Sequence, residues 1–168
     1  DGEGRLTLAI AGRPTGAWNC TWPRIGVQLR LPADIVQARW HGLGPGENYP
    51  DSSAAARMGV WHATLDELFT SYVVPQENGH RGGTRWVNAT TLAGAGLRAE
   101  AATPFGFSLH RYDTLDLERA MHQHELTPRD FVTLNLDVAQ NGLGSNSCGP
   151  DVQPEYRLMP GPFSFVWT

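Results

Sequence analysis

The stretch RIGVQLRL, residues 24–31, carries an apolar side chain at every second position: Ile25, Val27, Leu29 and Leu31. Successive side chains of a β-strand point to opposite faces of the sheet, so this spacing places the four apolar residues on one face. The residues between them are then free to face solvent. The stretch therefore predicts a strand with one buried face.

The same alternation recurs along most of the chain, and turns that contain Gly or Pro separate the alternating segments. RLTLAIAG, residues 5–12, puts Leu6, Leu8 and Ile10 on one face in the same way. Nine or ten short strands separated by turns predict an all-β fold, a large antiparallel β-sandwich. The other predicted strands are residues 35–42, 58–65, 84–92, 96–102, 105–112, 131–142, 154–159 and 163–168.

One segment departs from this pattern. In DTLDLERAMHQHEL, residues 113–126, the apolar residues recur at a spacing closer to the helical period than to alternation. Asp113 or Thr114 can cap a helix here, and acidic residues crowd its first turn, where the helix dipole favours them. The segment predicts one short helix over residues 115–122.

The composition bounds the class of protein. A chain of 168 residues is expected to form a single domain, residues 1–168. Its net charge of −4 and its scattered arginines argue against a nucleic-acid partner, which needs clustered positive charge. No apolar stretch approaches the ~20 residues of a membrane span, so no membrane partner is expected. With no signal-like N-terminus, we expect a cytoplasmic, bacterial protein.

Three constellations could carry chemistry, and each also has a structural interpretation. His122, His124 and Glu125 could bind a metal if they lay on a strand, but the end of a helix, where histidines cap carbonyls, is favoured. The two cysteines are too few for a disulfide framework, and two free, buried thiols are favoured over one bridge. A reactive cysteine needs a nearby cation or helix N-terminus; the sequence places neither beside Cys148, so an inert thiol is favoured over a nucleophile. The other cysteine is Cys20.

Glycoside hydrolysis requires two carboxylates held across the scissile bond. None of the available carboxylates pairs with another by sequence spacing, and solvated turn residues and caps account for most of them. The candidates are Glu47, Asp51, Asp66, Glu67, Glu77 and Asp137.

Two aromatic and glycine-rich loops are more distinctive. WHGLGPGENYPD, residues 40–51, and SYVVPQENG, residues 71–79, each contain a Glu-Asn pair. Carboxylate and amide side chains beside aromatic rings suit sugar hydroxyls and sugar faces. They suit equally well a tight loop whose buried backbone groups need partners. The composition leaves both interpretations open.

These loops, together with TPFGFSLHRY at residues 103–112, LNLDVAQNGLG at 134–144 and the glycine-rich segment GLGSNSCGP at 142–150, resemble the C-terminal domain of glycoside hydrolase family two β-galactosidases. The resemblance extends over essentially the whole chain. It implies a supersandwich of the galactose-mutarotase-like type, and it implies that the chain begins inside that domain, with unpaired sheet edges and exposed apolar surface.

In this family a (β/α)₈ barrel carries the catalytic glutamates, so no catalytic residue is expected in this chain. The resemblance implies a parent enzyme that cleaves terminal β-D-galactose from lactose-like β-galactosides with retention. It also implies Mg²⁺ and a monovalent cation (Na⁺ or K⁺) in that parent, contact with its barrel, and a homo-oligomer. The segment that matches residues 142–150 reaches the rim of the active site, which makes Ser147, Cys148 and Gly149 the expected substrate-rim residues.

Some members of the family carry a tryptophan where this chain has Cys148, and a thiol cannot offer an aromatic face to a sugar. An alternative from another class is a free-standing carbohydrate-binding or aldose-epimerase-like module on the same scaffold. An epimerase would need a histidine acid and a glutamate base that converge on the anomeric carbon in a concave cleft.

Overall fold

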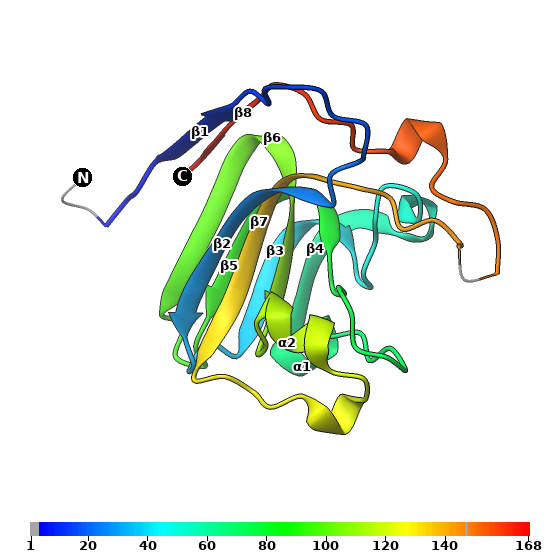
Figure 1. Ribbon diagram of the computed structural model, residues 1–168. Coiled ribbons are helices and arrows are strands. Elements are labelled where there is room, and N and C mark those ends of the chain that lie inside the picture. The colour runs from blue at the N-terminus through cyan, green and yellow to red at the C-terminus, as the bar shows by residue number, and fades with distance from the viewer. Residues whose placement is uncertain (1–3, 147) are drawn as a thin grey trace.

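A six-stranded antiparallel sheet forms the main body of the chain (Figure 1). The computed structural model describes residues 4–146 and 148–168. The strands lie in the order β2-β7-β6-β5-β3-β4, so that the sequence-distant strands β2 and β7 are neighbours. Their bounds are β2 Arg24–Pro32, β3 Gln37–Gly44, β4 Arg57–Thr64, β5 Arg81–Thr90, β6 Gly96–His110 and β7 Phe131–Gln140.

A two-stranded antiparallel ribbon, β1 (Leu8–Gly12) and β8 (Phe163–Trp167), lies across this sheet as a second, smaller layer (Figure 1). The rings of Phe165 and Trp167 pack edge-on against Phe105 of β6. Beyond the ribbon, Thr168 exchanges two backbone hydrogen bonds with Glu100 of β6. The predicted all-β sandwich is therefore confirmed, with one large sheet and one small one.

The strand β7 shows why simple alternation underestimates burial in this fold. Residues 132–137, with the sequence VTLNLD, are all buried. Val132, Leu134 and Leu136 face the hydrophobic core, while the intervening Thr133, Asn135 and Asp137 belong to a polar face. Loops cover that polar face, and the candidate site lies among them.

Several predicted elements differ from the structure. The two predicted strands at 96–102 and 105–112 are joined in the single strand β6, which ends at His110, two residues before the predicted end. The prediction of a strand at 154–159 is wrong: a 3₁₀ turn, η3 (Pro154–Tyr156), begins there, because Pro154 has no N–H and its fixed φ suits the start of a helical turn.

The helices were predicted in part. The helix α2 covers Thr114–Arg119, with Asp113 as its N-cap, and ends three residues before the predicted His122. A second short helix, α1 (Leu65–Leu68), was not predicted, although the capping box formed by Thr64 and Glu67 was readable in the sequence. The two remaining helical turns are η1 (Ser53–Ala55) and η2 (Gln123–Glu125). None of the described helices is long and apolar enough to cross a membrane.

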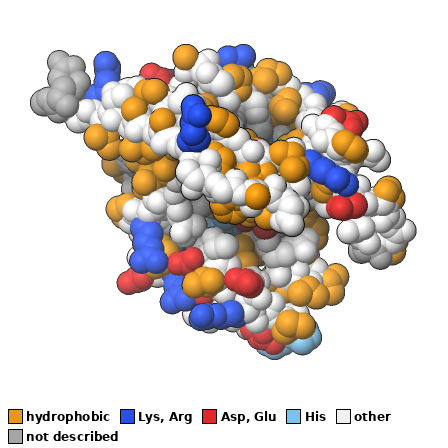
Figure 2. Space-filling model, turned by 45° about the horizontal axis from the view of Figure 1, so that its top comes forward, with side chains coloured by type: hydrophobic (Ala, Val, Ile, Leu, Met, Phe, Trp, Pro, Cys, Tyr) orange, Lys and Arg blue, Asp and Glu red, His pale blue; other side chains and the backbone are white. Residues whose placement is uncertain are grey.

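Unpaired edges and exposed apolar side chains are present, as expected. Within the described residues, β2 and β4 each pair on one side only, and Met58 and Val60 of β4 are about half exposed. Leu6 and Val166 are exposed on the ribbon side as well. Figure 2 shows hydrophobic side chains gathered over the face where the ribbon comes forward.

Candidate functional site

The loop at residues 142–150, which we call the rim loop, leaves β7 and closes on itself. The Ser145 backbone N–H and its hydroxyl both donate to the Pro150 carbonyl, at 3.1 and 3.3 Å. The Cys148 N–H donates to the Ser145 carbonyl at 3.3 Å. Cys148 and Gly149 are exposed, and Ser147 lies outside the described residues. The rim loop is a closed turn that presents Cys148 and Gly149 to solvent.

Asp51 holds the base of the rim loop. Its Oδ1 accepts the Leu143 N–H at 3.1 Å and its Oδ2 accepts the Gly144 N–H at 2.6 Å. The Gly142 N–H donates to the Tyr156 carbonyl at 2.9 Å. Sequence reasoning named Asp51 only as an unpaired carboxylate, because its partners lie more than ninety residues away along the chain.

A pocket of about 460 Å³ lies beside the base of the rim loop. It joins three segments that are far apart in the sequence: the loop after β3, the segment after α1, and the chain that follows β7. All three lie on the same side of the sheet, at the right of Figure 1. The two aromatic and glycine-rich loops and the rim loop, identified separately in the sequence, therefore meet in one place. The lining residues are Glu47, Tyr49, Asp51, Ser52, Ala55, Tyr72, Leu143, Gly144, Ser145, Pro150, Asp151, Gln153 and Tyr156.

Glu47 ties the two aromatic loops together. One carboxylate oxygen accepts the Tyr72 hydroxyl, and the other accepts the Gly79 N–H at 2.7 Å. Burial, together with this hydrogen bond to Glu47, raises the pKa of Tyr72 to about 12. The phenol therefore stays protonated at neutral pH and donates to the carboxylate.

The asparagines of the two Glu-Asn pairs serve the loops themselves. Both side chains are almost fully buried. The Asn48 amide accepts the Gly82 N–H at 2.9 Å and donates to the Gly46 carbonyl at 3.2 Å. Asn78 accepts the Thr70 N–H at 3.0 Å in a similar arrangement. Of the two open interpretations, these asparagines satisfy buried backbone groups.

Behind the pocket, Arg24 of β2 joins two of the candidate carboxylates. Its Nη2 lies 2.8 Å from Asp137 Oδ2 and 3.2 Å from Glu77 Oε1. Asp137 is 1% exposed, and Gly26 on the neighbouring strand makes room for it: a Cβ there would lie 2.6 Å from Oδ1. Burial raises the pKa of Asp137 to about 7, although Arg24 acts in the opposite direction. Burial also raises the pKa of Glu77.

His80 closes this cluster on the side of Asp137. Its Nδ1 donates to the Asn48 carbonyl at 2.8 Å, and its Nε2 lies 3.9 Å from Asp137 Oδ2. Burial lowers the pKa of His80 to about 4, so the ring is neutral at pH 7 and this contact is not an ion pair. The Tyr49 ring stacks on one side, and a Cβ at Gly106 would lie only 2.0 Å from Nε2.

His80 and Asp137 are buried, and they also line a separate pocket of about 280 Å³. The cluster of Arg24, Glu77, His80 and Asp137 is therefore mostly packed into the protein, with Arg24 and Glu77 partly exposed. Sequence reasoning missed it because its members come from four separate segments. The readable signal was Gly26, a glycine in the middle of an otherwise regular strand, which often marks a close approach.

A second buried histidine makes a pH prediction possible. His110 is 3% exposed, and burial lowers its pKa to about 4, below the ordinary value near 6.5. The neutral form is favoured by folding, so its contribution to stability is present above pH 6.5 and is lost as the pH falls towards 4. This loss is expected to reach about 1.4 kcal/mol per pH unit. The raised pKa of Asp137 has the opposite effect on stability, because it stabilises the folded chain as the pH falls from 7 to 4.

The measurement is therefore a difference between variants. Urea denaturation of the chain and of His110→Leu between pH 7 and 4.5 should show that the variant loses less stability on acidification. The exposed His124→Leu serves as the control and should follow the unchanged chain. Equal pH dependence of the two variants would show that His110 is not a buried neutral histidine.

His122, His124 and Glu125 lie on an exposed 3₁₀ turn, and not at the end of a helix as favoured from the sequence. The His122 ring stacks on His124, and its Nδ1 lies 3.0 Å from Glu125 Oε1. In residues 4–146 and 148–168, no group of three or more His, Cys, Asp or Glu side chains is placed to hold a metal ion.

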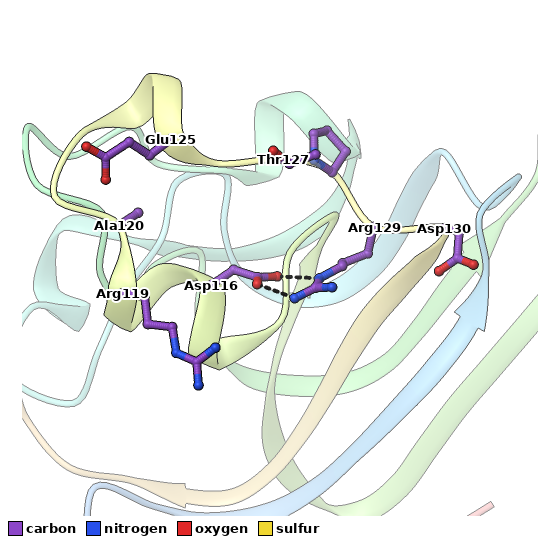
Figure 3. Close-up of a pocket in the computed structure, with 8 residues that line it drawn as sticks. Asp116, Arg119, Ala120, Glu125, Thr127, Arg129 and Asp130 are labelled. Atoms are coloured by element: carbon purple, nitrogen blue, oxygen red, sulfur yellow. Dashed lines mark hydrogen bonds and ion pairs between the residues drawn. The ribbon is translucent and has the colours of Figure 1, made fainter.

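A larger pocket, of about 560 Å³, lies between α2 and the segment that follows it (Figure 3). Figure 3 shows Asp116 and Arg129 facing each other, with Glu125 and Asp130 apart from this pair. Arg129 Nε donates to Asp116 Oδ2 at 2.8 Å, and this pairing lowers the pKa of Asp116. This ion pair holds the segment after α2 against the first turn of that helix. The charged residues Asp116 and Arg129 of the pocket therefore have a structural role.

Both cysteines are free, as favoured from the sequence, but the prediction that they are buried is wrong. Cys20 lies between β1 and β2, and Cys148 lies on the rim loop, where both are exposed. Neither segment packs into the core, because its glycines and prolines direct the chain over the surface.

Comparison with known proteins gives consistent matches. A family model described as "Beta galactosidase small chain" matches residues 1–168. A β-galactosidase of Arthrobacter sp. (strain B7) is 42% identical over 160 residues, which are 92% of this chain and 16% of that protein. One from Photobacterium profundum is 39% identical over 146 residues, 85% of this chain and 14% of that protein. One from Aeromonas hydrophila is 37% identical over an alignment of 173 positions, gaps included, which covers 100% of this chain and 16% of that protein. The chain thus spans about one sixth of the length of these relatives.

Proposed function

The chain belongs to the β-galactosidase small-chain family, and from this premise we propose that it is the C-terminal β-sandwich of a β-galactosidase. The parent enzyme would hydrolyse terminal non-reducing β-D-galactose in lactose-like substrates with a retaining mechanism. The observation that carries the proposal is the family match over all 168 residues. The relatives named above are about six times longer than this chain.

In this proposal the chain supports the reaction without carrying it out. A retaining glycosidase needs two carboxyl groups about 5 Å apart on either side of the substrate. Of the candidate carboxylates, Glu77 and Asp137 share Arg24 at the back of the pocket, and Asp137 is buried. Glu47 and Asp51 line the pocket, but their oxygens accept hydrogen bonds from the chain itself. These contacts support the view that the bond-breaking groups belong to a barrel outside this chain. The proposal places the ligands of Mg²⁺ and of a monovalent cation in the same longer polypeptide.

The epimerase-like alternative receives less support from the same residues. It requires a histidine and a carboxylate that a sugar can reach. His80 and Asp137 do approach each other, but they are 4% and 1% exposed and face packed glycines. A free-standing carbohydrate-binding module remains the second candidate, because tyrosines and carboxylates line the open pocket beside the rim loop.

The rim loop is the proposed contribution of this chain to the active site. Its exposed residues Cys148 and Gly149 would form part of the wall that the leaving group contacts. Ser147, which we also propose for this wall, lies outside the described residues. A thiol offers soft apolar contact and no aromatic face, which predicts tolerance of varied leaving groups in place of stacking on one.

The test uses chromogenic nitrophenyl β-galactosides and lactose. The isolated 168-residue chain should show no turnover, and the longer polypeptide that contains it should hydrolyse both. In that polypeptide Cys148→Trp should shift the ratio of kcat/KM between nitrophenyl galactoside and lactose on the order of tenfold, because aromatic stacking adds about 0.5–1.5 kcal/mol. Cys20→Trp, at the other exposed cysteine, is the matched control and should leave the ratio unchanged.

Turnover by the isolated chain would contradict the proposal that it is not catalytic alone. Unchanged ratios in Cys148→Trp across several leaving groups would contradict the place of the rim loop at the active site.

The proposal further includes a bacterial cytoplasmic enzyme, contact between this sandwich and the barrel, and assembly into a homo-oligomer. Met58 and Val60 are exposed on β4, which pairs with β3 on one side and has a free edge on the other, and they offer a surface for such assembly.

A further inference from the structure

We infer that Asp51 is a positioning residue that sets the orientation of the rim loop and, through it, the leaving-group preference of the active site. The effect on catalysis rests on the proposed function, whereas the mechanical role rests on the structure alone. Asp51 lies on the loop after β3, and the rim loop follows β7, so one carboxylate joins two segments that are distant in the sequence.

The first observation is the pair of hydrogen bonds at the base of the rim loop. Two successive backbone N–H groups, those of Leu143 and Gly144, point at the two oxygens of one carboxylate. Successive N–H groups form a concave anion-binding arrangement, and bonds to a charged acceptor are stronger than those to a neutral one. The carboxylate thus fixes both the position and the rotation of the loop base.

The second observation is that the glycines of the rim loop are required by this contact. A Cβ at Gly142 would lie 2.8 Å from Asp51 Oδ2 and 2.9 Å from Val152. Gly144 has a φ of +69°, and a Cβ there would lie 2.9 Å from the Val152 N. The Gly-x-Gly sequence therefore allows the loop base to approach Asp51 on one side and Val152 on the other.

The third observation is that the turn that carries Asp51 is closed by its own hydrogen bonds. The Tyr49 N–H donates to the Ser52 hydroxyl at 2.9 Å, and the Ser52 N–H donates to the Tyr49 carbonyl at 3.0 Å. The Tyr49 ring is 2% exposed and stacks on His80. The turn that carries Asp51 is therefore joined to the buried polar face through Tyr49.

In this view Ser145, Cys148 and Pro150 move together, because Ser145 donates to the Pro150 carbonyl and Cys148 donates to the Ser145 carbonyl. Rotation of the loop base at Leu143 and Gly144 would change the direction in which this closed turn points. Losing the bonds to Asp51 would free that rotation and move Cys148 without unfolding the turn. The consequence would be a change in leaving-group preference, with the core unaffected.

The experiment uses the longer polypeptide that contains this chain, with variants Asp51→Asn, Asp51→Ala and the control Asp34→Asn. Asp34 is an exposed aspartate in the turn between β2 and β3. A nitroxide is attached to Cys148, with the other cysteines replaced by serine, and its mobility is read by electron paramagnetic resonance. In unlabelled protein, kcat and KM are measured for nitrophenyl galactoside and lactose.

We expect label mobility to increase in the order wild type, Asp51→Asn, Asp51→Ala, because asparagine keeps one acceptor oxygen. The ratio of kcat/KM between the two substrates should change on the order of tenfold in Asp51→Ala, since small misplacements at an active site have effects of this size. Asp34→Asn should change neither quantity. This combination of results would support the inference.

Other results would contradict either the inference or the proposed function, and they distinguish the two. Unchanged label mobility in Asp51→Ala, or an unchanged ratio while Cys148→Trp shifts it, would show that Asp51 does not position the loop for catalysis. Increased mobility with unchanged ratios in both Asp51→Ala and Cys148→Trp would show instead that the rim loop is not at the active site.

Discussion

Replacement of Arg24 by methionine is expected to lower the free energy of unfolding by about 3–5 kcal/mol, because it removes the shared ion-pair and hydrogen-bond partner of one buried and one half-buried carboxyl group. Arg24 is the cation shared by Asp137, which is 1% exposed, and by Glu77. Methionine fills a similar volume but carries no charge. Urea denaturation of the 168-residue chain at pH 7 measures the loss.

A matched control lies on the same strand. Arg30 pairs with Asp113 at 3.2 Å, but its side chain is 64% exposed, so Arg30→Met should cost at most about 1 kcal/mol. Equal costs for the two substitutions would show that Arg24 is not part of a buried network. The double variant Arg24→Met, Asp137→Leu should cost less than the sum of the two single substitutions, since it removes both partners together.

The pH dependence of Arg24→Met gives a second check with a defined sign. Without Arg24, the pKa of Asp137 should rise further above its unfolded value, because the favourable interaction with the cation is gone. The stability that a raised carboxyl pKa contributes is present at low pH and is lost as the pH rises through the folded pKa. The difference between the variant and the unchanged chain should therefore grow from pH 5 to pH 8.

Truncation of Trp40 to alanine is expected to have an effect of similar size, about 3–5 kcal/mol of unfolding free energy. Trp40 of β3 is fully buried and meets Phe107 edge-on at a centroid distance of 5.6 Å. Its indole N–H donates to the Leu43 carbonyl at 3.0 Å, and the Arg81 guanidinium lies 5.5 Å above its ring. Alanine would leave a cavity and would remove both polar contacts.

The matched control is Trp18→Ala, because Trp18 is 48% exposed and lies outside the sheets. It should change the unfolding free energy by less than about 1 kcal/mol. Trp40→Phe should fall between the two, since it keeps an aromatic ring but leaves the Leu43 carbonyl without its donor. A cost for Trp40→Ala no larger than that for Trp18→Ala would contradict the packing described for the core.

The sequence predicted most of the fold because alternation is a local property. The strand at residues 24–31 was correctly predicted from four apolar residues, and β2 spans Arg24–Pro32 with the predicted face inward. The segment 154–159 does not form a strand, because Pro154 lacks an N–H and begins a 3₁₀ turn. The gap between the predicted strands 96–102 and 105–112 contains Pro104, yet Pro104 lies within β6, at a place where the pairing with β5 is irregular.

The site was predicted less well, because its contacts join residues that are distant in the sequence. The alternation of VTLNLD predicts Asn135 and Asp137 on an outer face, but the loops that cover that face come from elsewhere in the chain. The rim loop was found from its composition. Its anchor, Asp51, was not, since nothing in the spacing of Asp51 and Gly144 indicates that they meet.

The self-closure of the rim loop also has a consequence for protein engineering. Ser145 and Pro150 clasp the two ends of the turn, while Gly142 and Gly144 dock its base. Residues inserted between Ser145 and Pro150 would then be presented by a loop base whose own contacts are unchanged. In the parent enzyme that we propose, libraries of longer or bulkier insertions could be screened for transfer to new acceptor alcohols without redesign of the remaining structure.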